Sequence, residues 1–132
     1  MSHDNVDVVR RAADAFNRRD LAAVAGDFDR EAEWLEDQRY PGAGAFHGLD
    51  GVARSIDKWW DAWAEIRMEI DETIDLDDSV VVIGRAHARG HDSDVTVEAP
   101  FAGIFDFRAG KVTRVRMLSG RTEALDALGL SD

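Results

Sequence analysis

The sequence predicts an α+β domain in which N-terminal helices pack on a strongly curved antiparallel sheet and enclose a pocket. Apolar residues recur at helical spacing in the first half of the chain, and from Ile66 onward they alternate with polar residues at the period of a strand. Helices gathered before a run of hairpins are typical of α+β domains rather than of βαβ winding. With 132 residues the chain suits one domain, which we expect to span residues 1–132.

Helical spacing dominates the first 64 residues. The stripe of Val9, Ala13 and Phe16 indicates a first helix, and Asp20 stands where the N-cap of a second one belongs. The clearest helix carries three tryptophans on one apolar face. The expected segments are helices at 3–18, 21–28 and 50–64, a short strand at 32–37 and a glycine-rich loop at 38–48.

Four consecutive strands are expected to form an antiparallel meander before a last helix. We place them at 66–76, 80–89, 95–107 and 111–119, with a helix at 122–128 and Gly129 just beyond its end. Pro100 predicts a bend or bulge in the third of these strands. Glu72 interrupts the apolar register of the first, either as a bulge that turns it outward or as an inward carboxylate.

The charge balance excludes some partners. The chain has 27 acidic and 16 basic residues, a net charge of −11, which repels phosphate backbones and anionic lipid headgroups. We therefore expect no nucleic-acid partner and no membrane partner. No apolar run of membrane-spanning length or apolar leader segment occurs, so a cytoplasmic protein is expected. The absence of cysteine removes disulfides and thiolate chemistry.

Four segments together resemble a known superfamily. The runs AADAFNRRDLAAVAGDFDREAEWLED, FHGLDGVARSIDKWWDAW, DSVVVIGRAHARG and AGKVTRVRMLSGRTEALDALGL look like SnoaL-like proteins of the nuclear-transport-factor-2-like (NTF2-like) superfamily. The resemblance implies a cone-shaped fold and a homodimer formed through the outer face of the sheet. It does not imply one activity, because the superfamily includes ketosteroid isomerases, polyketide cyclases, epoxide hydrolases, dehydratases and non-catalytic binding proteins.

The resemblance to ketosteroid isomerases is incomplete at the site. It places the catalytic base at Glu36, where burial beside Trp34 would suit proton transfer. The oxyanion-hole tyrosine of those enzymes falls on Ala12, which has no hydrogen-bond donor in its side chain. The acid of their third long strand has no counterpart in 101–105.

The resemblance to epoxide hydrolases and cyclases is also partial. Those proteins alternate an Arg and an Asp on one strand, and here Arg85 is followed by His87 in the Asp position. A second acid on their last strand falls on Met117, and a further one before the final helix falls on Gly120.

The remaining candidate catalytic residues are Glu36, Asp37, Arg85 and His87. A histidine near a carboxylate can transfer protons at neutral pH, and an arginine can stabilise a developing oxyanion. Arg85 and His87 share one face of their strand, which is either the pocket side or the outer side. Each residue also has an interpretation without a catalytic role. Arg85 can form salt bridges with nearby acids, and Glu36 and Asp37 can lie at a solvated strand end.

The pocket is expected to be apolar. Candidate ligand-binding residues are Trp34, Tyr40, Trp63, Phe101 and Met117. Tryptophans on a helical stripe more often belong to the core than to a ligand-binding surface. Of the three, Trp63 lies nearest the helix end, and it is the one that we expect to reach a cavity. Tyr40 and His47 flank the glycine-rich loop, either as part of a lid or as surface residues. No convincing metal spacing or phosphate-binding motif occurs, so we expect no metal and no cofactor.

Two functions stay open at this point. One is cofactor-free proton transfer on a small apolar carbonyl compound, polyketide- or steroid-like, as in isomerases, cyclases or hydrolases of this type. The other is non-catalytic binding of a small apolar molecule by the same fold.

Overall fold

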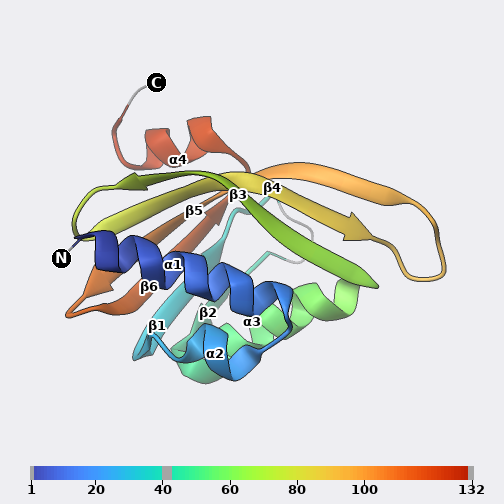
Figure 1. Ribbon diagram of the computed structural model, residues 1–132, viewed down its shortest axis with the longest axis horizontal. Coiled ribbons are helices and arrows are strands. Elements are labelled where there is room, and N and C mark those ends of the chain that lie inside the picture. Colours follow the sequence, from blue (N-terminus) through green and yellow to red (C-terminus); the bar gives the residue numbers. More distant parts are fainter. Residues whose placement is uncertain (1, 40–42, 131–132) are drawn as a thin grey trace.

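The computed structural model describes residues 2–39 and 43–130 and contains three layers. Three helices cover one face of a six-stranded sheet, and a fourth helix lies on the opposite face (Figure 1). The elements are α1 (Ser2–Asn17), α2 (Leu21–Ala25), β1 (Phe28–Glu36), β2 (Ala45–His47), α3 (Gly48–Ala62), β3 (Glu65–Asp75), β4 (Ser79–Arg89), β5 (Thr96–Arg108), β6 (Lys111–Leu118) and α4 (Arg121–Ala127). The α+β architecture with N-terminal helices on a curved sheet is confirmed.

The sheet has the order β2-β1-β6-β5-β4-β3 and is not closed. Strands β3 to β6 form the antiparallel meander expected from the alternating sequence. Strand β1 instead pairs parallel to β6, a long-range contact that no local pattern predicts. The short strand β2 adds to β1 inside the segment that we expected to be loop throughout.

The helix α2 is short, and the chain enters β1 soon after it ends. Asp20 caps α2 as expected, because its carboxylate accepts a hydrogen bond from the backbone N–H of Ala23 at 3.1 Å. The helix expected at 21–28 stops at Ala25, and β1 already begins at Phe28. The charged run from Asp29 to Glu31 hid the start of this strand, because it interrupts the apolar alternation.

A bulge in β3 changes the side of the sheet on which its apolar residues lie. The pairing register with β4 shifts between Ile70 and Glu72, so the even-numbered residues change sides at that point. Ile66, Met68 and Ile70 face the helices, whereas Ile74 packs with the α4 side. The apolar residues that alternate along 66–76 therefore do not all share one face of the sheet. The bulge interpretation of Glu72 is confirmed, since Glu72 is exposed and pairs with Arg121.

Gly84 lies on β4 next to this bulge. A Cβ atom at Gly84 would stand 2.0 Å from the carbonyl oxygen of Glu69 on β3. The close approach of the two strands therefore requires glycine at this position.

Pro100 does not produce the bulge expected of it. The register between β4 and β5 runs unshifted through the pair Arg85–Pro100, and the irregularity of β5 lies at Asp106–Phe107 instead. Strand β6 reaches only Ala102 along β5. The missing N–H of Pro100 is tolerated because no described strand pairs with that edge of β5.

Two apolar clusters hold the layers together. The larger one joins α1, α2 and α3 to the concave face of the sheet, with fully buried Val52, Ile56 and Val115 at its centre. The smaller one seats α4 on the outer face, where Ala124 packs with Val81 and Ile104. No helix in the described part of the chain is long and apolar enough to cross a membrane.

Candidate functional site

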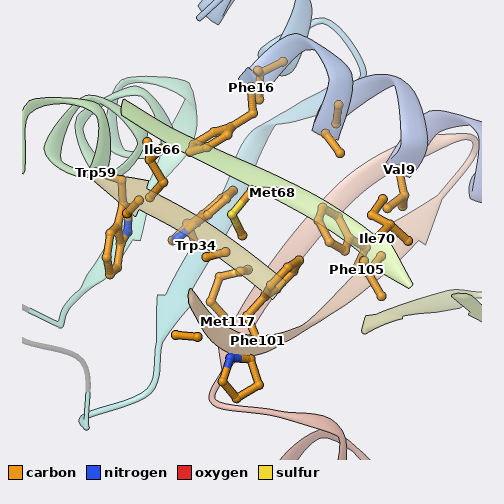
Figure 2. Close-up of a pocket in the computed structure, with 18 of the residues that line it drawn as sticks. Val9, Phe16, Trp34, Trp59, Ile66, Met68, Ile70, Phe101, Phe105 and Met117 are labelled. Carbon is orange, nitrogen blue, oxygen red and sulfur yellow. The ribbon is translucent and has the colours of Figure 1, made fainter. Parts of the chain in front are cut away.

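A cavity of about 290 Å³ lies between the helices and the concave face of the sheet. It opens beside the first half of β5, where Val97, Ala99 and Pro100 line it and are exposed. Figure 2 shows its aromatic, aliphatic and thioether side chains. The lining residues are Val9, Ala12, Ala13, Phe16, Val24, Phe28, Trp34, Trp59, Trp63, Ile66, Met68, Ile70, Val82, Ala86, Ala88, Val97, Ala99, Pro100, Phe101, Phe105 and Met117. Not one of these described lining residues carries a charge.

Tryptophans form a large part of the wall. Trp59 reaches the cavity from the C-terminal half of α3, Trp63 from the position just after the end of that helix, and Trp34 from β1. The ring of Trp34 stacks on that of Phe28, with centroids 6.4 Å apart and planes inclined by 19°. Trp60 instead packs against Phe16 in the core and does not line the cavity.

Glu36 is a buried carboxylate just behind this wall. Its side chain is 0% exposed, and it follows Trp34 on the inward face of β1. It accepts hydrogen bonds from Ser55 Oγ at 2.9 Å and Trp59 Nε1 at 2.6 Å, and it pairs with Lys58. Glu36 itself is absent from the cavity lining, but the indole that it holds is part of that lining.

Lys58 completes this cluster. Its ammonium group lies 5.1 Å from the ring centre of Phe46 and 5.2 Å from that of Trp59, within the range of cation–π attraction. The buried charge of Glu36 is thus compensated by one cation and two neutral donors, which is what burial of a carboxylate requires.

Asp37 is bound by Arg39 and not by the residues that contact Glu36. The hydrogen bonds that the Arg39 side chain and backbone donate hold the pKa of the Asp37 carboxyl below its ordinary value. A lowered pKa makes a carboxylate a weaker base, and Asp37 does not line the cavity.

Arg85 and His87 lie on the outer face of the sheet. Their neighbours Ala86 and Ala88 line the cavity, as does Val82 on the same strand, and the alternation of the strand sends Arg85 and His87 to the other side. Arg85 contacts Asp71 at 3.0 Å, and both Glu69 and Glu98 at 3.2 Å.

The contacts of Arg85 shift the pKa of Asp71 and of Arg85 itself. Hydrogen bonds from Arg85 lower the pKa of Asp71, and the same contacts raise the pKa of Arg85 further above its ordinary value. His87 Nε2 lies 2.8 Å from Glu69. The four candidate catalytic residues are therefore not brought together, because Glu36 lies on the concave side and Arg85 and His87 on the outer one.

The candidate ligand-binding residues fall mostly in one place. Trp34, Trp63, Phe101 and Met117 all line the cavity. Tyr40 lies outside the described residues. His47 is exposed and pairs with Glu31 at 3.0 Å.

Sequence reasoning missed the partners of Glu36. Ser55, Lys58 and Trp59 stand at positions i, i+3 and i+4 of α3 and therefore share one helix face. Ser55 is a buried polar residue within the apolar stripe of that helix, which is the signal that could have indicated a polar partner on the facing strand.

The comparisons with known proteins concern the family and the fold. The model of the SnoaL-like domain matches residues 9–115. An NTF2-like protein of unknown function from Burkholderia pseudomallei K96243 is 26% identical, with a TM-score of 0.81 over 96% of this chain and 97% of that one. No curated protein matches the sequence.

Two further solved structures share the fold and contain small molecules. TerC co-crystallised with polyporic acid is 22% identical, with a TM-score of 0.79 over 95% of this chain and 97% of that one. A hypothetical protein with a ketosteroid-isomerase-like fold from Catenulispora acidiphila, in complex with trimethylamine, is 13% identical, with a TM-score of 0.76 over 94% and 93%.

The match and the fold define the class: this chain is a SnoaL-like domain protein of the NTF2-like superfamily.

Proposed function

We propose that this protein binds a small, uncharged, largely apolar molecule in the cavity between its helices and its sheet. The observation that carries the proposal is the wall itself, because every described side chain in it is apolar or aromatic. Such a wall favours burial of apolar surface and opposes an ionised ligand, which would lose its hydration without gaining a partner. Trp34, Trp63, Phe101 and Met117 are the contact residues in this proposal.

The size of the cavity limits which ligands can fit. At about 290 Å³ it stands at the lower end of the range of small-molecule pockets, about 300–1,000 Å³. A bicyclic or tricyclic aromatic molecule suits this volume better than a four-ring steroid. The co-crystal of TerC with polyporic acid supports a ligand site in this fold, but it concerns that protein.

A filled-cavity variant tests this proposal. We expect 2-acetylnaphthalene to bind the wild type by calorimetry and to raise its Tm. Ala86→Leu adds bulk to the cavity wall and should weaken binding at least tenfold. Ala22→Leu makes the same change on the exposed side of α2 and should leave binding unchanged. Equal affinity in all three proteins would refute the assignment of the site.

A second candidate function is proton transfer on a bound carbonyl compound, with Glu36 as the proton-transfer group. The observation in its favour is the 2.6 Å distance between the Glu36 carboxylate and Nε1 of the wall residue Trp59, so that displacement of this indole would bring the carboxylate into contact with the ligand. Enolisation would replace the methyl protons of 2-acetylnaphthalene by deuterium in D2O, which NMR measures. Faster exchange with the wild type than with Glu36→Gln supports catalysis, and equal rates contradict it.

We further propose that two copies associate through the part of the outer sheet face that α4 leaves uncovered. This face carries Arg85, Asp71 and Glu98, whose opposite charges suit self-complementary contact about a two-fold axis. Sedimentation velocity should give a dimer for the wild type and a monomer for Glu98→Arg. A wild-type monomer at all concentrations would contradict this interface.

A further inference from the structure

We propose that the indole N–H of Trp34 is the hydrogen-bond donor that orients the ligand in the cavity, so that the ligand is a neutral aromatic molecule carrying a carbonyl-type oxygen. This inference rests on the proposed binding function and adds the polar contact that selects the ligand.

The first step is the state of the Trp34 nitrogen. Trp34 is only 8% exposed, and its Nε1 is buried with no hydrogen-bond partner among the described residues. An unsatisfied buried donor costs about 1–3 kcal/mol, and native structures keep few of them. A donor of this kind in the wall of a cavity is explained when a ligand supplies the acceptor.

The second step is its position. Trp34 belongs to the cavity lining, and Figure 2 draws it among the labelled wall residues, with its nitrogen on the Trp59 side in this view. Stacking on Phe28 restricts the rotation of the ring. The lining also contains Met68 and Met117, whose flexible side chains can adapt to the shape of a bound ligand.

The other three tryptophans do not offer the same contact. The N–H of Trp59 is donated to Glu36 at 2.6 Å. Trp60 also has a buried Nε1 without a partner among the described residues, but it does not line the cavity. Trp63 lines the cavity, and its Nε1 is not among the buried unpaired atoms. Trp34 alone among these tryptophans combines a buried, unpaired donor with a place in the wall.

The chemistry of the ligand follows from this single donor. A carbonyl oxygen accepts one N–H hydrogen bond without carrying a charge, so it satisfies Trp34 at no cost in buried charge. A carboxylate or an ammonium group would enter a wall whose described residues provide no opposite charge. The inference therefore favours aromatic ketones and related neutral carbonyl compounds over acids and amines.

A matched pair of ligands separates this contact from general apolar binding. 2-Acetylnaphthalene and 2-isopropenylnaphthalene have nearly the same shape, but the second has a methylene group in place of the oxygen. The wild type should bind the ketone about fivefold to tenfold more tightly, the value expected for one hydrogen bond. In Trp34→Phe the ratio of the two affinities should fall to about one, even where the smaller ring weakens both.

The other tryptophans provide the controls. Trp60→Phe removes an unpaired N–H outside the cavity and should keep the wild-type ratio. Trp63→Phe makes a contact residue smaller, so it should weaken binding of both compounds alike and also keep the ratio. In the wild type, NMR should show the Trp34 indole N–H moving downfield with the ketone and not with the alkene. This measurement keeps the test valid if Trp34→Phe fails to fold.

The outcomes distinguish the two proposals. If neither compound binds the wild type, the proposed binding function fails. If both bind equally and the Trp34 resonance is unchanged by the ketone, the binding function stands and the role of Trp34 is refuted. If the ratio collapses in Trp63→Phe instead, the donor has been assigned to the wrong tryptophan.

Discussion

The carboxylate of Glu36 accepts a 2.6 Å hydrogen bond from the indole nitrogen of Trp59, so a charge outside the cavity lining fixes part of the cavity wall. Lys58, the residue before Trp59, and Ser55, one turn earlier in α3, contact the same carboxylate. Because both oxygens of Glu36 are occupied, the strand β1 and the helix α3 are joined at the point where they border the cavity. The stability of the fold and the shape of the pocket therefore depend on one residue.

Glu36→Gln should lower the free energy of unfolding by about 2 kcal/mol, since a neutral amide keeps one acceptor for three donors and loses the charge opposite Lys58. Chemical denaturation measures this loss. Glu33→Gln changes an exposed residue on the opposite face of β1 and should have little effect. Equal stabilities of the two variants would mean that the Glu36 cluster does not stabilise the fold.

Gly84→Ala should destabilise the protein by about 3 kcal/mol or more, because its Cβ would meet the backbone of Glu69 at 2.0 Å and force the two strands apart. Gly90→Ala is the control, since its Cβ would find its nearest neighbour, Ser93, at 3.8 Å. Thermal unfolding followed by circular dichroism compares the two. A wild-type Tm for Gly84→Ala would contradict the close approach of β3 and β4 at the bulge.

Asp71 should contribute stability that depends on pH. Its pKa is lowered in the folded state by hydrogen bonds from Arg85, so the folded state binds its proton less readily than the unfolded state. The contribution is present above the ordinary pKa of about 3.9 and is lost as the pH falls through the lower folded-state value. Urea denaturation of the wild type and Asp71→Asn should therefore show a difference at pH 6 that shrinks below about pH 4.

The same pair supplies the control for this pH effect. In an Arg85→Gln background, Asp71→Asn should remove most of its pH-dependent difference, because the hydrogen-bond donor is already absent. Salt should weaken the wild-type effect, since the side chains are half-exposed and screened. An undiminished difference at pH 3 would show that the Asp71 charge is not its source.

Arg85→Ala and His87→Ala should leave the affinity for 2-acetylnaphthalene within about twofold of the wild type, because both side chains lie on the sheet face opposite the cavity. Met117→Ala, which changes a lining residue, should weaken binding clearly. Calorimetric titration of the three variants measures both effects. Loss of binding in His87→Ala with an intact fold would place the ligand site elsewhere.

The sequence indicated that Glu36 lies on the inward face of β1, but it did not indicate which residues contact it. Alternation along β1 shows that Trp34 and Glu36 share a face, and the tryptophan stripe shows that α3 has a broad apolar side. The sequence does not show that Ser55, Lys58 and Trp59 meet Glu36, because this contact joins a strand to a helix about 20 residues later. Side-chain contacts between a strand and a helix depend on how the two elements pack, and the local periodicity of the sequence does not predict this packing.

The sequence by itself determined the class of the fold and the order of its elements except β2, because helical and strand periods are local properties of the chain. The tertiary structure decided which strand face meets the cavity. Arg85 and His87 must share a face whichever way β4 turns, and only the packing of the helices over the side of the sheet that carries Val82, Ala86 and Ala88 sends them outward. The same packing buries the nitrogen of Trp34 without a partner among the described residues, so the polar contact left for a ligand became visible only in three dimensions.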